Sequence, residues 1–224
     1  MEKHEPYFNL LDALKEAGCP VCFLVKKNIH KFMDDFLYEG VNDPGLRKEI
    51  KNSLGFCSRH AWQLQKFGDG FGIGIVYEYL MQLMLGKLKA VDGSAASIKA
   101  VLKELDRGER AKKLCIFCGE ETDVEGRYIS VFLENFDDPE LKFAYKNSFG
   151  LCLPHLNLVL NKCRNKKFIT EIISIESAKL NGLIAEVKEF QRKHNYRFSK
   201  EKIGKEGDSW IRAIQKMIGK EGVF

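Results

Sequence analysis

Apolar residues recur with a helical period along much of the chain. One continuous apolar face, spaced i, i+3 and i+4, is formed by Val25, Ile29, Phe32, Met33, Phe36 and Leu37. A broader face is formed by Tyr128, Ile129, Val131, Phe132 and Leu133. Long amphipathic helices are also expected at about 75–91 and 168–190. The pattern predicts an all-α protein.

Capping and turn residues indicate where several helices begin and end. Asp43-Pro44 and Asp138-Pro139 each place an aspartate suited to the N-cap before a proline suited to the first turn. Gly55 and Gly150 are expected to end the short helices that follow. A last helix is predicted to start after Asp208 and to end at Gly219.

The cysteines reveal an internal repeat. The sequence Cys19-Pro-Val-Cys22 is followed by Cys57-Ser-Arg-His60, and Cys115-Ile-Phe-Cys118 is followed by Cys152-Leu-Pro-His155. The intervening residues match in the same register, including Asn52-Ser53 with Asn147-Ser148. We therefore predict two duplicated helical halves with pseudo-twofold symmetry, residues 1–95 and 96–190, and a segment 191–224 without a counterpart.

The repeated pairs have the spacing of metal ligands. A CxxC or CxxH step turns two donor side chains to the same side of the chain. Three thiolates and one imidazole form a standard structural zinc set. The residues between the pairs of one half contain a helix, a turn and a helix, which we expect to bring the pairs together. The prediction is two Zn²⁺ ions per chain, one in each half, held by Cys19, Cys22, Cys57 and His60 and by Cys115, Cys118, Cys152 and His155.

Each ligand pair is also expected to lie at a helix start. Gly18 ends one helix and Pro20 opens the next, and Pro154 fits only a first helical turn. The positive end of a helix lowers the pKa of a thiol. A Zn²⁺ ion with three thiolates carries a net charge of −1, which the nearby cations Lys26, Arg59 and Lys112 are placed to offset.

Three other interpretations of the cysteines stay open. An iron–sulfur cluster uses the same ligand types, although the dense cysteine runs of bacterial ferredoxins are absent. A redox-active CxxC resembles Cys19-Pro-Val-Cys22, but no thioredoxin-like βαβ pattern surrounds it. Buried thiols without a ligand are the third. Residues without a repeat partner are not expected to be ligands: Cys163, His4, His30 and His194.

Composition places the chain among globular proteins and locates its charge. The 224 residues include 36 basic and 31 acidic side chains, a net charge of +5. Nine basic and four acidic residues lie in 191–224, so this segment carries the whole excess. It is a candidate site for an acidic ligand or a protein partner, and less so for nucleic acid. Aromatic residues are interleaved there at Tyr196, Phe198 and Trp210.

No targeting or membrane segment is expected. The N-terminal residues lack the apolar core of a signal peptide, and no window approaches about 18 uncharged apolar residues. An odd number of cysteines, 7, also argues against a secreted disulfide framework. A cytoplasmic protein with reduced or metal-bound thiols is expected.

The sequence carries no readable catalytic signature, because Walker, GxSxG and HExxH motifs are absent. Whether the chain is an enzyme is left open. The residues favour a non-enzymatic, metal-stabilised scaffold or interaction protein. The alternative is an iron–sulfur, thiol-redox or metal-handling protein that uses the same cysteines.

The combined motifs resemble an uncharacterised family of bacterial proteins that is common in Clostridia. The resemblance rests on CPxC…GFCxxH, on CxxC…GLCxxH and on the ending Tyr196-Arg-Phe…Gly207-Asp-Ser-Trp-Ile-Arg-Ala-Ile, and it covers nearly the whole chain. It implies a bacterial cytoplasmic protein and assigns no catalytic residue. One departure is Ile116, which stands where the first half has Pro20.

Overall fold

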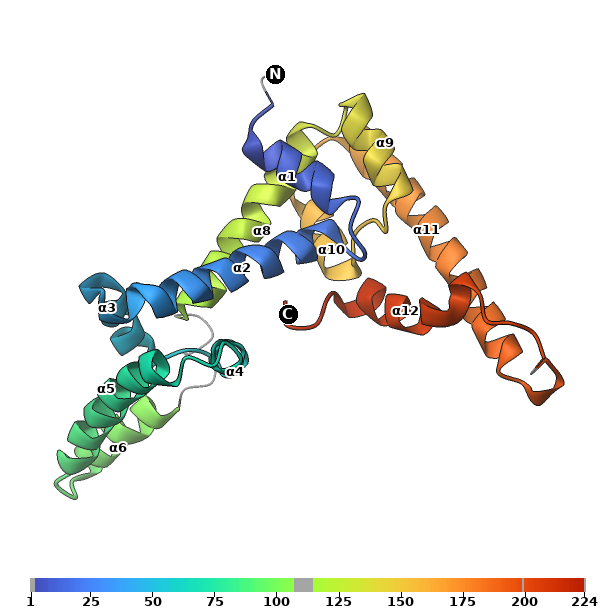
Figure 1. Ribbon diagram of the computed structural model, residues 1–224. Coiled ribbons are helices and arrows are strands. Elements are labelled where there is room, and N and C mark those ends of the chain that lie inside the picture. The colour runs from blue at the N-terminus through green and yellow to red at the C-terminus, as the bar shows by residue number, and fades with distance from the viewer. Residues whose placement is uncertain (1–2, 107–114, 199, 224) are drawn as a thin grey trace. The chain divides into compact units, whose positions relative to one another are not determined.

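The computed structural model describes residues 3–106, 115–198 and 200–223, and over these ranges the chain forms helices and no strand (Figure 1). The all-α fold class is therefore confirmed. The helices in chain order are α1 (Glu5–Ala13), α2 (Pro20–Tyr38), η1 (Gly40–Asn42), α3 (Pro44–Ser53), α4 (Ser58–Gln65), α5 (Gly70–Lys89), α6 (Ala95–Leu105), α8 (Ile116–Glu134), α9 (Pro139–Asn147), α10 (Leu153–Lys162), α11 (Lys166–Lys193), η2 (Tyr196–Phe198), η3 (Lys205–Asp208) and α12 (Ser209–Ile218).

The chain divides into two compact units that differ from the two sequence repeats. Unit 1 lies within residues 1–26 and 124–224, and unit 2 comprises residues 27–123. Helices α2 and α8 each contribute residues to both units. The boundary predicted at residue 95 marks the sequence repeat and not the edge of a compact unit.

The local signals in the sequence correspond to the observed helix ends. Asp43 accepts the backbone N–H of Leu46, and Asp138 accepts those of Glu140 and Leu141, as N-caps do. Helix α12 follows Asp208, whose side chain makes no capping hydrogen bond, and runs to Ile218, with Gly219 as its C-cap. Helix α5 covers most of the helix expected at about 75–91 and starts earlier, at Gly70.

Helix α6 was not predicted, although its sequence carries the signals. Ser94 caps it by accepting the N–H of Ser97. Apolar residues recur at helical spacing in Ile98, Val101, Leu102 and Leu105. This helix starts at the boundary predicted between the two halves, and the repeat pattern does not indicate a helix there.

Unit 2 has a core of aromatic rings around α2 and α8. On α2, Ile29, Met33 and Phe36 are buried, as the helical pattern predicts. Phe117 of α8 meets Phe36 and Phe56, with ring centroids 5.8 and 5.0 Å apart. The Phe36–Phe117 contact is edge-to-face, and aromatic pairs of this kind add to the free energy gained from burial.

Unit 1 encloses a buried ion pair. Glu176 of α11 and Lys216 of α12 are 1% and 2% exposed, and their charged atoms lie 2.5 Å apart. The second Glu176 oxygen accepts hydrogen bonds from the Tyr145 hydroxyl and, at 2.8 Å, from the Leu151 backbone N–H. The carboxylate therefore connects α9, α11, α12 and the loop before α10.

At the matching positions of unit 2, within the part of the chain that the structure describes, the repeat has no such ion pair. The N-caps Asp69 of α5 and Asn165 of α11 fix the register, which aligns the buried residues Val76 with Ile172 and Leu80 with Glu176. Leucine thus fills in one repeat the position that a charge fills in the other.

The basic C-terminal segment is largely neutralised by local carboxylates. Side chains of α11 supply many of these partners, including Glu186 and Glu189. Ion pairs form at Arg192, Lys193, Lys205, Arg212 and Lys216. Among the described residues, no helix combines the length and apolar character needed to cross a bilayer.

We expect the buried ion pair to be costly to break and less costly to replace as a whole. Lys216→Ala leaves the Glu176 carboxylate buried without its cation, and should lower the free energy of unfolding by about 3–5 kcal/mol. The double variant Glu176→Leu with Lys216→Met, which copies the leucine of the other repeat, should recover only part of that loss, because the Tyr145 hydroxyl and the Leu151 N–H lose their acceptor. Denaturant unfolding followed by circular dichroism measures both.

Arg192→Ala is the matched control, because its ion pair with Glu201 is exposed. It should change the free energy of unfolding by no more than about 1 kcal/mol. Equal losses in Lys216→Ala and Arg192→Ala would contradict this account of the buried pair.

Candidate metal centres

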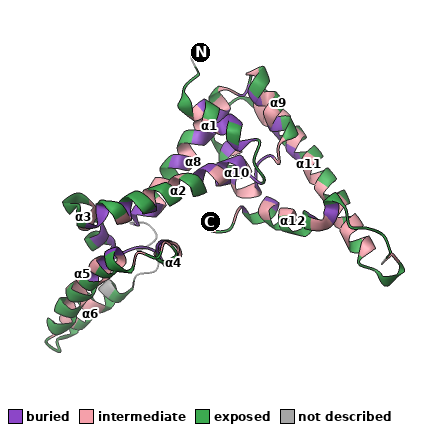
Figure 2. Cartoon of the chain, viewed as in Figure 1, coloured by how far each residue is buried: buried purple, intermediate pink, exposed green. Residues whose placement is uncertain are grey.

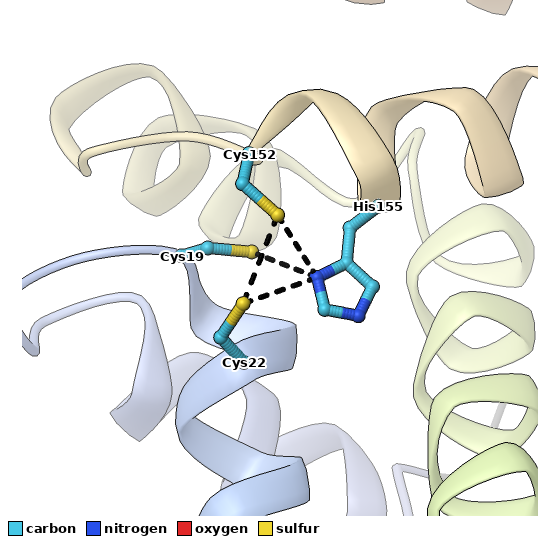
Figure 3. Close-up of side chains that lie close together, drawn as sticks. All are labelled: Cys19, Cys22, Cys152 and His155. Atoms are coloured by element: carbon cyan, nitrogen blue, oxygen red, sulfur yellow. Dashed lines mark hydrogen bonds between the residues drawn. The ribbon is translucent and has the colours of Figure 1, made fainter. Parts of the chain in front are cut away.

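All eight predicted ligands gather into two clusters of three cysteines and one histidine. The first cluster comprises Cys19, Cys22, Cys152 and His155, and the second comprises Cys57, His60, Cys115 and Cys118. In each cluster the four donor atoms lie within 4.8 Å of one another. Figure 3 shows the first cluster, with the three sulfur atoms around one ring nitrogen of His155.

The predicted pairing within each half is wrong. The CxxC of the first repeat meets the CxxH of the second in unit 1, and the CxxH of the first meets the CxxC of the second in unit 2. Helix length is consistent with this pairing, because the 16 residues of α2 after Cys22 rise about 24 Å, whereas the 10 residues of α3 span only about 15 Å.

Each ligand pair occupies the first turn of a helix, as predicted. Cys57 and Cys152 are the N-cap residues of α4 and α10, and Cys19 and Cys115 directly precede α2 and α8. The second ligand of each pair stands at the third helical position. Side chains at the N-cap and the third position both reach the open end of a helix, which is the geometry of a capping box. Here sulfur and nitrogen donor atoms occupy the positions of the capping side chains.

The donor atoms have the spacing of a tetrahedral site. Around an ion with bonds of about 2.3 Å to sulfur and about 2.05 Å to nitrogen, two sulfurs lie about 3.8 Å apart and sulfur lies about 3.6 Å from nitrogen. In the first cluster, Cys22 Sγ and Cys152 Sγ are 3.7 Å apart, and His155 Nδ1 lies 3.1–3.4 Å from the three sulfurs.

The second cluster repeats these distances. Cys118 Sγ lies 3.6 Å from Cys57 Sγ, and the three sulfurs lie 3.3–3.5 Å from His60 Nδ1. All seven cysteines of the chain are free thiols. Each cluster could therefore bind one metal ion.

All candidate ligands are buried except Cys118, which is partly exposed, and their pKa values show how strongly they interact. The neighbouring sulfurs of Cys152 and Cys19, together with burial, raise the pKa of Cys22. Burial opposes ionisation of Cys19, but contacts with Cys152, Cys22 and His155 lower its pKa well below the usual range. Burial lowers the pKa of His155 and is outweighed by Cys152, Cys19 and Glu125, which raise it to about 11.

The pKa values in the second cluster shift in the same directions. The sulfurs of Cys115 and Cys118 lower the pKa of Cys57 against the effect of burial. The sulfurs of Cys115 and Cys57 raise the pKa of Cys118, and burial adds to this shift. Burial lowers the pKa of His60, but Cys115, Cys57 and Glu121 together raise it to about 10.

A carboxylate of α8 meets the outer nitrogen of each histidine. His155 Nε2 forms a hydrogen bond of 3.1 Å with Glu125 Oε1. His60 Nε2 lies 3.1 Å from Glu121 Oε1. The Glu125 carboxylate can hold the proton on Nε2 of His155 and leave the lone pair of Nδ1 for a metal, as in carboxylate–histidine–zinc sites, whereas the His60–Glu121 contact does not have hydrogen-bond geometry. His155 is thus oriented for metal binding.

Sequence reasoning missed these two glutamates. Their signal is spacing, since Glu121 and Glu125 stand three and seven residues after Cys118 and so share its helix face. The repeat does not indicate these glutamates, because the matching positions of α2 are the buried apolar residues Val25 and Ile29.

One predicted cation lies beside a cluster. Arg59 forms an ion pair with Glu121, the carboxylate that contacts His60. Burial lowers the pKa of Arg59 but is outweighed by Glu121 and by Cys118. Lys26 is exposed at the edge of unit 1, and Lys112 lies outside the described residues.

The residues without a repeat partner lie outside both clusters. The Cys163 thiol donates to the backbone carbonyl of Asn165 at 3.6 Å. The His30 ring packs on Phe67, and His194 Nδ1 lies 2.8 Å from the backbone carbonyl of Phe190.

A tight loop places Cys152 at the first cluster. Gly150 has φ +81°, a left-handed conformation that glycine adopts without strain. A Cβ atom at this position would lie 2.4 Å from Glu176 Oε1, the atom that accepts the N–H of Leu151. The loop therefore needs glycine for its backbone conformation and for the room it leaves.

Gly150→Ala should destabilise unit 1 more than its backbone conformation alone explains. Gly68 has nearly the same φ, +79°, but a Cβ there meets no atom within 4 Å. Gly68→Ala should therefore cost about 1–2 kcal/mol of unfolding free energy, the usual cost of a left-handed residue. Gly150→Ala should cost more, because the carboxylate must also move. Equal losses in denaturant unfolding would contradict the close contact.

Comparison with known proteins places the chain in a family. Residues 1–222 match the family described as "Family of unknown function (DUF6062)". The chain is also 30% identical over 191 residues to the "Uncharacterized 23.9 kDa protein in xynA 3'region" of Caldicellulosiruptor sp. (strain Rt8B.4), covering 84% of this chain and 88% of that protein. No solved structure matches it. The chain belongs to DUF6062, a bacterial family of unknown function.

Proposed function

We propose that the chain is a non-enzymatic scaffold in which two structural Zn²⁺ ions each hold one helical unit together. The observation that carries this proposal is the tetrahedral spacing of three sulfurs around a histidine nitrogen, found twice. Zinc favours four protein ligands of this type in closed structural sites. The glutamates on the outer histidine nitrogens support the same assignment.

The spacing favours a single ion over an iron–sulfur cluster. In a cluster the ligands bind different iron atoms, which separates the ligand sulfurs more widely than one shared ion does. Sulfurs 3.6–3.7 Å apart match ligands of one ion. We therefore propose one Zn²⁺ in each cluster, two per chain.

Burial favours a structural over a reactive role for the thiols. A redox or catalytic cysteine needs access to its partner, whereas Cys19, Cys22 and Cys152 are 0–3% exposed. Four protein ligands also leave no open position on a tetrahedral ion. A centre of this kind contributes folding free energy of about 10–16 kcal/mol, as much as a whole domain usually has.

The scaffold would present its helices and C-terminal segment to a protein partner. Arg192, Lys193, Lys205, Arg212 and Lys216 of the segment 191–224 form ion pairs with carboxylates of unit 1. These pairings reduce the positive charge that a nucleic acid would contact. Reduced thiols ready to bind zinc are consistent with the cytoplasm.

The metal content of double variants tests the proposal and the pairing together. The wild-type chain should contain two zinc ions, show no visible absorption bands and lack sulfide. Cys19→Ser with Cys152→Ser removes two ligands of the first cluster and should leave one zinc. Cys19→Ser with Cys57→Ser removes one ligand from each cluster and should leave none. Elemental analysis of anaerobically purified protein measures all three.

Cys163→Ser is the matched control and should retain two zinc ions, because Cys163 lies outside both clusters. Coloured wild-type protein with iron and sulfide would overturn the zinc assignment. Protein without bound metal would overturn the metal sites altogether. The opposite result in the two double variants would overturn the pairing.

Glu125→Gln should weaken zinc binding in the first cluster. The variant keeps the shape of the side chain but removes the charge that orients His155. Loss of such a partner lowers metal affinity about 10–100-fold. Competition with a chromogenic chelator measures the change, with one of the two ions expected to leave earlier. Glu134→Gln, at an exposed position of the same helix, should leave the titration as in the wild type.

A further inference from the structure

Helix α12 exposes its apolar side and buries its polar side. The exposed large side chains are Trp210 (50%), Ile211 (41%), Ile214 (50%), Met217 (55%) and Ile218 (63%). Ser209 and Lys216 are buried instead, at 0% and 2%. At about 100° per residue, the apolar side chains cover one continuous arc of about 120° on the helix. We call this arc the α12 face, and Figure 2 shows exposed residues along α12.

Charged contacts hold the helix in this orientation. Lys216 forms the buried ion pair with Glu176 of α11. Arg212 contacts Glu186 of α11 at 2.6 Å and also pairs with Asp208. Rotating α12 to bury its isoleucines would break these contacts and bury a lone carboxylate. The exposure of the α12 face is thus fixed by the structure of unit 1.

The exposed area is as large as a dimer interface requires. Phe143 of α9, 71% exposed, lines with Ile211 a groove of about 880 Å³ and extends the α12 face. Side chains of this size present about 150–250 Å² each, so six of them at these exposures leave about 600 Å² per chain uncovered. Two such surfaces bury about 1,200 Å², the lower limit for a specific and stable interface.

We propose that the α12 face binds the α12 face of a second copy of the chain, with the two helices antiparallel. Ile211, Ile214 and Ile218 follow the 3–4 spacing of a helix-pairing seam. An antiparallel pair places Asp208, just before one helix, against Lys220, just after the other, and opposes the two helix dipoles. A parallel pair would place Asp208 against its own copy. The twofold axis of the antiparallel pair passes near Ile214.

The mass in solution tests the interface. Wild-type protein should sediment as a dimer at micromolar concentration, and Ile214→Glu should be a folded monomer with unchanged helix content. Ile98→Glu on α6 of unit 2 is the matched control, since Ile98 is similarly exposed at 43%, and it should stay dimeric. A monomeric wild type, or a dimer that Ile214→Glu leaves intact, overturns the proposal. The experiment does not depend on zinc, whose content is measured separately in each sample.

A charge-pair variant tests the direction of the helices. In the antiparallel arrangement residue 211 of one copy faces residue 218 of the other. Ile211→Glu and Ile218→Lys should each disrupt the dimer, and the double variant should recover it in part, because each new acid meets a new base. Failure of the double variant to recover any dimer overturns the antiparallel arrangement.

Vesicles separate this proposal from a membrane-binding role for the same face. Cosedimentation with vesicles of anionic phospholipid should not remove wild-type dimer from solution, because dimerisation covers the α12 face. Binding to these vesicles that Ile214→Glu abolishes would overturn the second copy as the occupant.

Discussion

Contact among three thiols and one imidazole is the constraint on which each unit depends. Thiolates packed within 4.8 Å repel one another, so they ionise together only if positive charge lies among them. The opposite pKa shifts of Cys19 and Cys22 express this conflict. Four helix N-termini, two at each cluster, supply part of the positive charge. In the proposed zinc sites a divalent ion would supply the rest, and binding it would tie folding to the cluster.

The clusters join segments that are far apart in the chain. Cys22 and Cys152 are separated by 130 positions, and Cys57 and Cys118 by 61. Closing such loops costs conformational entropy, and the cost grows only slowly with length. The cross-pairing of the repeats therefore adds only a small entropic cost.

The sequence was sufficient to predict which cysteines and histidines gather in clusters and where most helices end, because these depend on residues close together in the chain. N-cap aspartates, first-turn prolines and the CxxC and CxxH steps all act within one turn. The pairing of the clusters depends on how far α2 extends before the chain reverses, which the repeat pattern does not contain. The glutamates on the histidines escaped notice for a similar reason, since their role depends on a partner that arrives from another helix. Fold class followed from periodicity alone, whereas the compact units did not follow from the repeat.

The orientation of α12 also depends on a residue from another helix and cannot be predicted from its own sequence. It connects the first cluster to the exposed α12 face. Its apolar spacing alone suggests a helix that buries Trp210 and Ile214, yet Glu176 of α11 draws Lys216 inward. The same carboxylate accepts the N–H of Leu151, the residue before the ligand Cys152. One buried side chain therefore positions both a metal-ligand loop and the helix that carries the apolar face. In the other repeat Leu80 fills this position, and no counterpart of 191–224 follows. The charge at Glu176 therefore occurs together with the C-terminal segment that supplies its partner Lys216. The repeated motifs form two similar clusters, and the buried ion pair connects the first of them to the α12 face.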